Sequence, residues 1–120
     1  MKNLDDDALA LVARYFAALS VPMRLRILSQ LREGERNVGE ITDATGCTQA
    51  NVSKHLGVLA LSGLVAKSHR GTSVYYRFAD DTVYRLCDLV CGQLDRRFSE
   101  EAAQRRALGS AARAAANRDR

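Results

Sequence analysis

The sequence has 120 residues, of which 47% are hydrophobic and 27% charged, as expected for one globular domain. The chain opens on Asp5, Asp6 and Asp7 rather than a basic segment followed by an apolar run, so no signal peptide is expected, and no apolar run approaches the roughly 20 residues that span a bilayer. Three cysteines, an odd number, argue against the disulfide framework of a secreted protein. We therefore expect a cytoplasmic protein with no membrane partner.

The positive charge is concentrated in one window of the chain. The net charge is +4, yet no Asp or Glu occurs between Ala44 and Ala79. That window holds Lys54, Lys67, Arg70, Arg77 and both histidines. A segment without acids favours a surface that approaches the phosphates of a nucleic acid.

Apolar spacing predicts three helices in the first part of the chain, over 5–19, 22–32 and 38–45. Pro22 suits the first turn of the second helix, and we expect the arginines Arg24, Arg26 and Arg32 to remain in solvent. Leu25, Leu28 and Leu31 of the second helix are expected to face inward. The apolar residues at helical spacing in the first helix are Leu9, Val12, Ala13 and Phe16, and those that share one side of the third are Val38, Ile41 and Ala44.

A fourth helix is predicted over 49–61, directly after a short turn that contains Gly46. Thr48 is the expected N-cap, and Cys47 and Val52 have the spacing of a hydrophobic staple. Two helices joined by so short a turn form the helix-turn-helix pattern.

A β-hairpin is predicted next, with strands over 65–67 and 74–78 and a polar tip over 68–73 that contains Gly71. A hairpin that follows a helix-turn-helix is a wing. The predicted fold class is therefore mainly α with a small β-hairpin wing (α+β), a winged helix-turn-helix.

A last helix is predicted over 81–98. One apolar stripe runs along it, and a body this small would cover that stripe with the first helix and a second subunit. We therefore expect residues 1–98 to form the DNA-binding and dimerisation domain, and residues 99–120 an Ala- and Arg-rich tail that extends the helix or is disordered. The stripe consists of Val83, Leu86, Cys87, Val90, Cys91 and Leu94.

Three stretches resemble the ArsR/SmtB family of bacterial repressors: LSVPMRLRILSQL at 19–31, GCTQANVSKHLGVLALSGLV at 46–65 and GTSVYYRF at 71–78. The resemblance covers roughly residues 8–94. It implies a homodimer that represses transcription from a palindromic operator and leaves the DNA when a metal, metalloid or oxidant reaches a sensor site. The inducer differs among members of the family.

The first two turns of a helix that enters the major groove carry most base contacts. Gln and Asn side chains pair with adenine edges, and Ser, Lys and His side chains hold phosphates. We expect Val52, Leu56 and Leu59 to pack inward. The predicted DNA-binding residues are Thr48, Gln49, Ala50, Asn51, Ser53, Lys54 and His55 of the fourth helix, and Lys67, His69 and Arg70 of the wing.

The cysteines admit two interpretations each. Cys87 and Cys91 lie one helical turn apart, so they could bind arsenite or a soft divalent metal, or form a strained disulfide on reaction with an oxidant or reactive sulfur; they could equally be packed apolar residues. Cys47 precedes a helix N-terminus, which favours a reactive thiolate, but it also fits the staple. No cofactor is certain.

Two metal-binding patterns of the family are missing. Where a thiol-rich stretch resembling ELCVCDL would stand, the chain has ERNVGEI, with Asn37 and Gly39 at the thiol positions. For the zinc site of the last helix, Asp80 matches, but Thr82 and Gln93 replace histidines, so imidazole ligation is not expected.

An enzyme is not expected, because the chain has no CxxC motif, no phosphate-binding glycine loop and no pairing of nucleophile and base. Three alternatives remain open at this point. They are a dimeric winged-helix regulator without a cysteine sensor, a thiol-based oxidoreductase, and a dimeric interaction module that does not bind DNA.

Overall fold

Helices α1 (Asp6–Ala18), α2 (Pro22–Leu31), α3 (Val38–Thr45) and α4 (Gln49–Leu61) precede a hairpin of β2 (Val65–Arg70) and β3 (Ser73–Phe78) in the computed structural model, which describes residues 3–118. A long helix, α5 (Thr82–Arg118), follows. The chain divides into two compact units, one ending at Val83 and the other beginning at Tyr84. Each predicted element is present, so the expected winged helix-turn-helix arrangement is confirmed.

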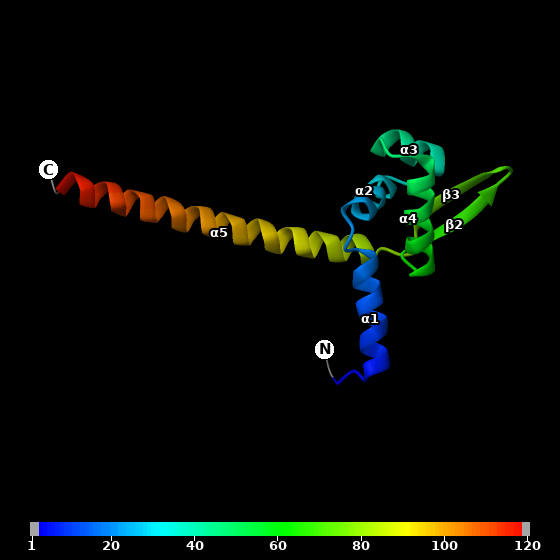
Figure 1. Ribbon diagram of the computed structural model, residues 1–120, viewed down its shortest axis with the longest axis horizontal. Coiled ribbons are helices and arrows are strands. Elements are labelled where there is room, and N and C mark those ends of the chain that lie inside the picture. The colour runs from blue at the N-terminus through cyan, green and yellow to red at the C-terminus, as the bar shows by residue number, and fades with distance from the viewer. Residues whose placement is uncertain (1–2, 119–120) are drawn as a thin grey trace. The chain divides into compact units, whose positions relative to one another are not determined.

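The core of the first unit lies where α2, α3 and α4 gather at the base of the hairpin (Figure 1). Ile27, Ile41 and Leu56 are completely buried there. The inward assignment of Leu25 made from the sequence is wrong. Leu25 is 42% exposed, because it lies about 110° around the helix from the face formed by Ile27, Leu28 and Leu31. Ala44, predicted to share one side of its helix with Ile41, is exposed, and its neighbour Thr45 takes the buried position.

The sheet has a third strand that the sequence did not predict. β1 (Arg36–Asn37) pairs with β3 in antiparallel fashion, so the strand order is β1-β3-β2. Two residues are too few to show the alternation by which strands are recognised. β1 ties the segment before α3 to the wing.

The tip of the wing is shorter than the predicted range of 68–73. Arg70 pairs with Ser73, so only Gly71 and Thr72 form the turn. Gly71 has a φ of +62°, as a glycine at the first central position of a type II′ turn does. The extra strand residues place Ser68, His69 and Arg70 in β2 rather than in a loop.

The last helix continues to Arg118, well past residue 98, where the sequence pattern ended it. Ala and Arg, which dominate its last turns, are strong helix formers. The tail is therefore a helical extension, while its division into a separate domain at residue 98 stays a prediction. Among residues 3–118 no single helix is long and apolar enough to cross a membrane; only the pair of α1 and α2, bent by 79°, reaches that length and composition together, which is weak evidence for a span.

The turn between α3 and α4 depends on Gly46. Its φ is +70°, and its N–H donates to the carbonyl oxygen of Thr42 at 3.0 Å. The replacement of Gly46 by Ala should lower the free energy of unfolding by about 1–2 kcal/mol, since a Cβ disfavours this backbone conformation. Gly57 of α4 has helical φ and open space around its Cα, so Gly57→Ala should raise the same quantity by about 0.5–1 kcal/mol. Urea denaturation of both variants measures the two effects, and equal effects of the same sign would contradict this account.

Candidate nucleic-acid interface

Helix α4 has one buried face and one exposed polar face. Val52, Leu56 and Leu59 are each completely buried, as predicted. The polar face comes from the first two turns of the helix, where the residues predicted to bind DNA lie. Those that are exposed are Gln49, Ala50, Asn51, Ser53 and Lys54.

The N-terminus of α4 is closed by Thr48, as predicted. The Thr48 hydroxyl oxygen accepts the N–H of Asn51 at 3.2 Å, and Thr48 itself is exposed. No acidic residue occurs in the first turn. The partial positive charge of the helix end thus meets solvent beside the polar face, which suits a phosphate oxygen.

His55 is held by a residue that the sequence analysis placed in solvent. Nε of Arg24 on α2 donates to Nδ1 of His55 at 3.2 Å, and Arg24 also donates to the carbonyl oxygen of Ala18 at 3.4 Å. Arg24 therefore joins α2 to α4. Because Nδ1 accepts this bond, the proton of the neutral ring lies on Nε2. The Nε2–H of His55 can therefore act as a hydrogen-bond donor. Burial, then Arg24 and then Lys54, hold the pKa of His55 below its ordinary value of 6.5.

Arg70, expected to extend toward DNA from the wing, is held within the protomer. Its guanidinium forms an ion pair with Glu35 and lies 4.8 Å from the centre of the Tyr75 ring, a cation–π distance. Glu35 lies outside the acid-free window of the sequence, yet its carboxylate contacts Arg70 within that window. No pattern in the sequence indicated this contact. Lys67 and His69 are exposed on the same strand, as expected for phosphate contacts.

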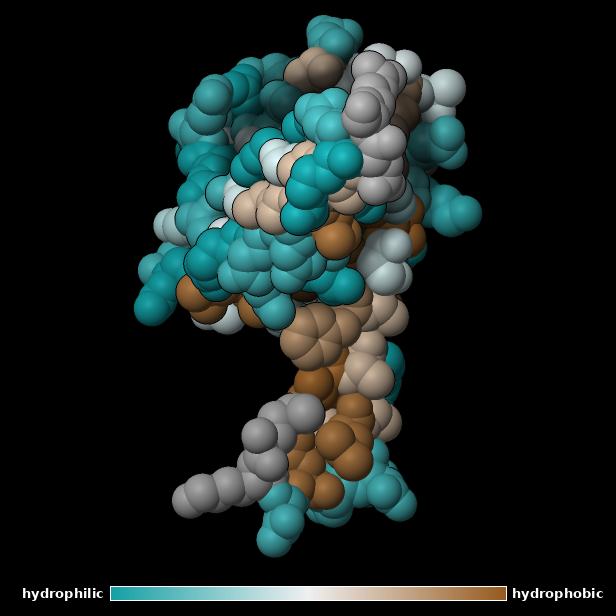
Figure 2. All heavy atoms as spheres, turned by 90° about the vertical axis from the view of Figure 1, so that its left-hand side faces the viewer, coloured by the Kyte–Doolittle hydropathy of each residue, from teal (hydrophilic) through white to brown (hydrophobic). Residues whose placement is uncertain are grey.

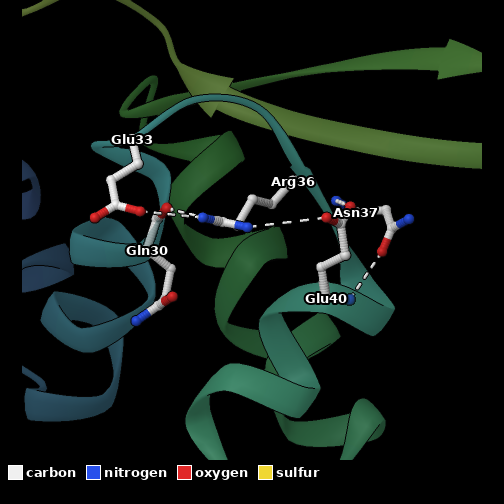
Figure 3. Close-up of polar contacts among 5 residues, drawn as sticks. All are labelled: Gln30, Glu33, Arg36, Asn37 and Glu40. Atoms are coloured by element: carbon white, nitrogen blue, oxygen red, sulfur yellow. Dashed lines mark hydrogen bonds and ion pairs between the residues drawn. The ribbon is translucent and has the colours of Figure 1, made fainter.

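The stretch that holds thiols in some family members is a structural brace here (Figure 3). The Asn37 side chain accepts the N–H of Glu40 at 2.8 Å, and Glu40 accepts the N–H of Asn37 at 3.1 Å, which forms a capping box for α3. Arg36 donates to the carbonyl oxygen of Gln30 at 3.0 Å and pairs with Glu33 at 3.3 Å. These contacts orient α3, on which α4 packs.

The three cysteines lie in different surroundings. Cys47 is half-buried, with its sulfur 3.4 Å from the thioether of Met23 on α2, a contact that the spacing did not predict. Cys87 is half-buried and Cys91 exposed. Within residues 3–118, no group of three or more His, Cys, Asp or Glu side chains is arranged to hold a metal ion. Asp80 instead accepts the N–H of Thr82 at 2.8 Å, which lowers the pKa of its carboxyl group.

Comparison with known proteins agrees with this geometry. Residues 22–67 match the model of the bacterial regulatory protein arsR family. The chain is 42% identical over 85 residues to the HTH-type transcriptional regulator NmtR of Mycobacterium tuberculosis, an overlap of 71% of each protein. This protein belongs to the ArsR family. The resemblance noted in the sequence is thus confirmed.

Two solved structures of similar proteins share the fold. The homodimeric winged helix-turn-helix DNA-binding domain of Mb0332 from Mycobacterium bovis, fragment 1–100, has a TM-score of 0.72 at 39% identity, covering 82% of this chain and 94% of that one. Rv0081 of M. tuberculosis has a TM-score of 0.75 at 32% identity, covering 82% and 99%. The relatives of this ArsR-family protein are transcriptional regulators, so the protein is not an enzyme, as the sequence predicted.

The Arg24–His55 contact has a measurable pH signature. A neutral His55 accepts the bond from Arg24, so its contribution to stability should be complete above about pH 6.5 and lost as the pH falls through the lower pKa of the folded state. In an NMR titration the His55 ring should have its midpoint below 6.5. Arg24→Gln should raise that midpoint, while Arg26→Gln, an exposed change on the same helix, should leave it in place. A wild-type midpoint at or above 6.5 would refute the assignment.

Proposed function

We propose that this ArsR-family protein is a transcriptional repressor that binds a palindromic operator as a homodimer, with α4 in the major groove and the wing beside it. The observation that carries the proposal is the division of α4 into a completely buried apolar face and an exposed polar one without acids. The exposed Gln49 and Asn51 can pair with base edges, and Ser53 and Lys54 can hold the flanking phosphates.

Unpaired apolar surface on both units supports the homodimer. On α1, Leu9, Leu11 and Phe16 are 43%, 63% and 52% exposed, and Figure 2 shows apolar residues gathered along this helix. On α5, Val90 and Leu94 of the predicted stripe are 45% and 42% exposed. Surfaces of this kind mark association sites, and a second copy of the chain would bury them. The domain of Mb0332 is itself homodimeric.

Two substitutions separate base contacts from phosphate contacts. A palindrome selected by the wild-type protein from a random duplex library serves as the probe. Gln49→Ala should cost roughly 1–3 kcal/mol and relax the preference at one base pair of each half-site. Lys54→Ala should weaken binding to all sequences alike. It should also make the slope of log K against log[salt] shallower by about 2, which corresponds to one phosphate contact per subunit. The control is Gln93→Ala on α5, which is exposed and should change neither quantity.

The proposal fails if the wild-type protein selects no two-fold symmetric sequence, or binds it with one chain per site. If it selects one but both α4 variants bind like the wild type, the assigned face of α4 is wrong.

For the inducer, we propose that it acts on Cys87 and Cys91. These thiols lie one turn apart on a helix whose apolar face is exposed, so a change there would alter how two copies meet. Two thiols do not complete the coordination of a three-coordinate metalloid, so binding of arsenite or a soft metal would need a further ligand from a partner or a small thiol. A thiol oxidant or reactive sulfur needs only the pair itself, and would take up the two electrons released as a disulfide forms.

Serine substitution distinguishes sensing from packing. Cys87→Ser and Cys91→Ser, singly and together, are compared with Cys47→Ser in an assay of operator release by arsenite, cadmium, zinc, peroxide and polysulfide. The double variant should bind the operator but no longer respond to the active inducer. Release at the wild-type inducer concentration by a folded double variant would exclude a cysteine sensor at this position. A response lost only in Cys47→Ser would move the sensor to the turn before α4.

A further inference from the structure

The second half of α5 has a different charge character from the first. The segment from Tyr84 to Glu101 contains three arginines and four acidic residues. From Ala102 to Arg118 there is no acid, and the arginines are Arg105, Arg106, Arg113 and Arg118. Asp119 and Arg120, which follow in the sequence, add no net charge.

The four arginines of this distal segment, residues 102–118 of α5, are exposed side chains on continuous helix. Within residues 3–118 none of the four forms an ion pair with an acidic side chain, whereas Arg97 in the first half pairs with Glu101 at 3.4 Å. Along residues 102–118 the positive charge is therefore presented to solvent.

The distal segment is poorly suited to pair with a second copy of the chain. The apolar stripe continues as far as Phe98, after which Glu101 and Arg105 occupy the positions that would extend it. Leu108 is the one large apolar side chain between Ala102 and Arg118. A helix that carries charge without an apolar stripe gains little from burial, so its most favourable partner is a polyanion.

We propose that the distal segment is a second DNA-binding element, which contacts the phosphates of the duplex outside the palindrome. The inference rests on the proposed function, which brings a DNA duplex to this protein. Arginine binds phosphate through a planar fork of donors, and such contacts carry no sequence information. The segment is about 25 Å long at 1.5 Å per residue. Duplex DNA carries one charge per roughly 1.7 Å, so a helix of this length can face several phosphates.

The helix provides a matched pair of variants for the test. Arg105→Gln/Arg106→Gln and Arg96→Gln/Arg97→Gln each remove two adjacent, exposed positive charges from α5. Glutamine keeps the helix propensity close to that of arginine. Binding of the full-length protein to a 60-bp duplex of mixed sequence is measured by fluorescence anisotropy over a series of NaCl concentrations.

The distal pair should make the slope of log K against log[NaCl] shallower by about 2–4, which corresponds to one or two phosphate contacts per subunit of a dimer. The proximal pair should change it by less than about 1. Arg105→Lys/Arg106→Lys keeps the charge and should retain most of the wild-type slope. Circular dichroism measures the helix content of each variant, and sedimentation measures its oligomeric state; both are expected to equal those of the wild type.

Three results would overturn the proposal. An unchanged slope in the distal pair means that the segment serves another partner, such as an RNA or an acidic protein. Equal changes in both pairs mean that net charge alone acts. A dimer lost only in the distal pair means that the segment binds a second copy. None of these outcomes is confused with failure of the proposed function, which appears as the absence of a selected palindrome.

Discussion

The arrangement of the candidate interface depends on the complete burial of one face of α4. Val52, Leu56 and Leu59 anchor the helix against its neighbours in the first unit. Because side chains three and four positions apart share a face, burial of these three turns Ser53 and Lys54 outward. Gln49 is exposed at the N-terminal end of the helix. A substitution that leaves a cavity at any of these three positions would destabilise the fold and would also displace the polar face of α4. Stability and the proposed DNA recognition thus depend on one helix.

Polar contacts around this helix refine its position. Arg24 bonds to His55, the Asn37–Glu40 capping box orients α3, and Glu35 pairs with Arg70 on the wing. His55 and Arg70, two of the predicted DNA-binding residues, are therefore already engaged within the protomer. For Arg70 to bind a phosphate, it would have to exchange Glu35 for the DNA, so its net contribution to affinity is smaller than its charge suggests. Lys54 and Lys67 are exposed, have no ion pair with another residue of 3–118, and are better suited to phosphates.

Long or strongly patterned elements could be predicted from the sequence. The helices over 22–32, 38–45 and 49–61, the N-cap at Thr48 and the buried face of α4 all follow from apolar spacing and capping residues. The features that the sequence did not predict are those set by tertiary contacts. β1 has only two residues, the Arg24–His55 and Arg70–Glu35 pairs join positions more than 30 residues apart, and the length of α5 rests on helix propensity without an apolar stripe. The family is clear from the DNA-binding half, while the inducer depends on residues that vary within the family.

The central claim is that the exposed face of α4 and the wing meet DNA. Amide chemical shifts of the ¹⁵N-labelled protein, followed as a DNA duplex is added, test it most directly. With a duplex limited to the palindrome, the largest changes should fall on the first two turns of α4 and on β2 between Lys67 and Arg70, with smaller changes along α1. Changes concentrated on α1, with α4 and the wing unaffected, would contradict it.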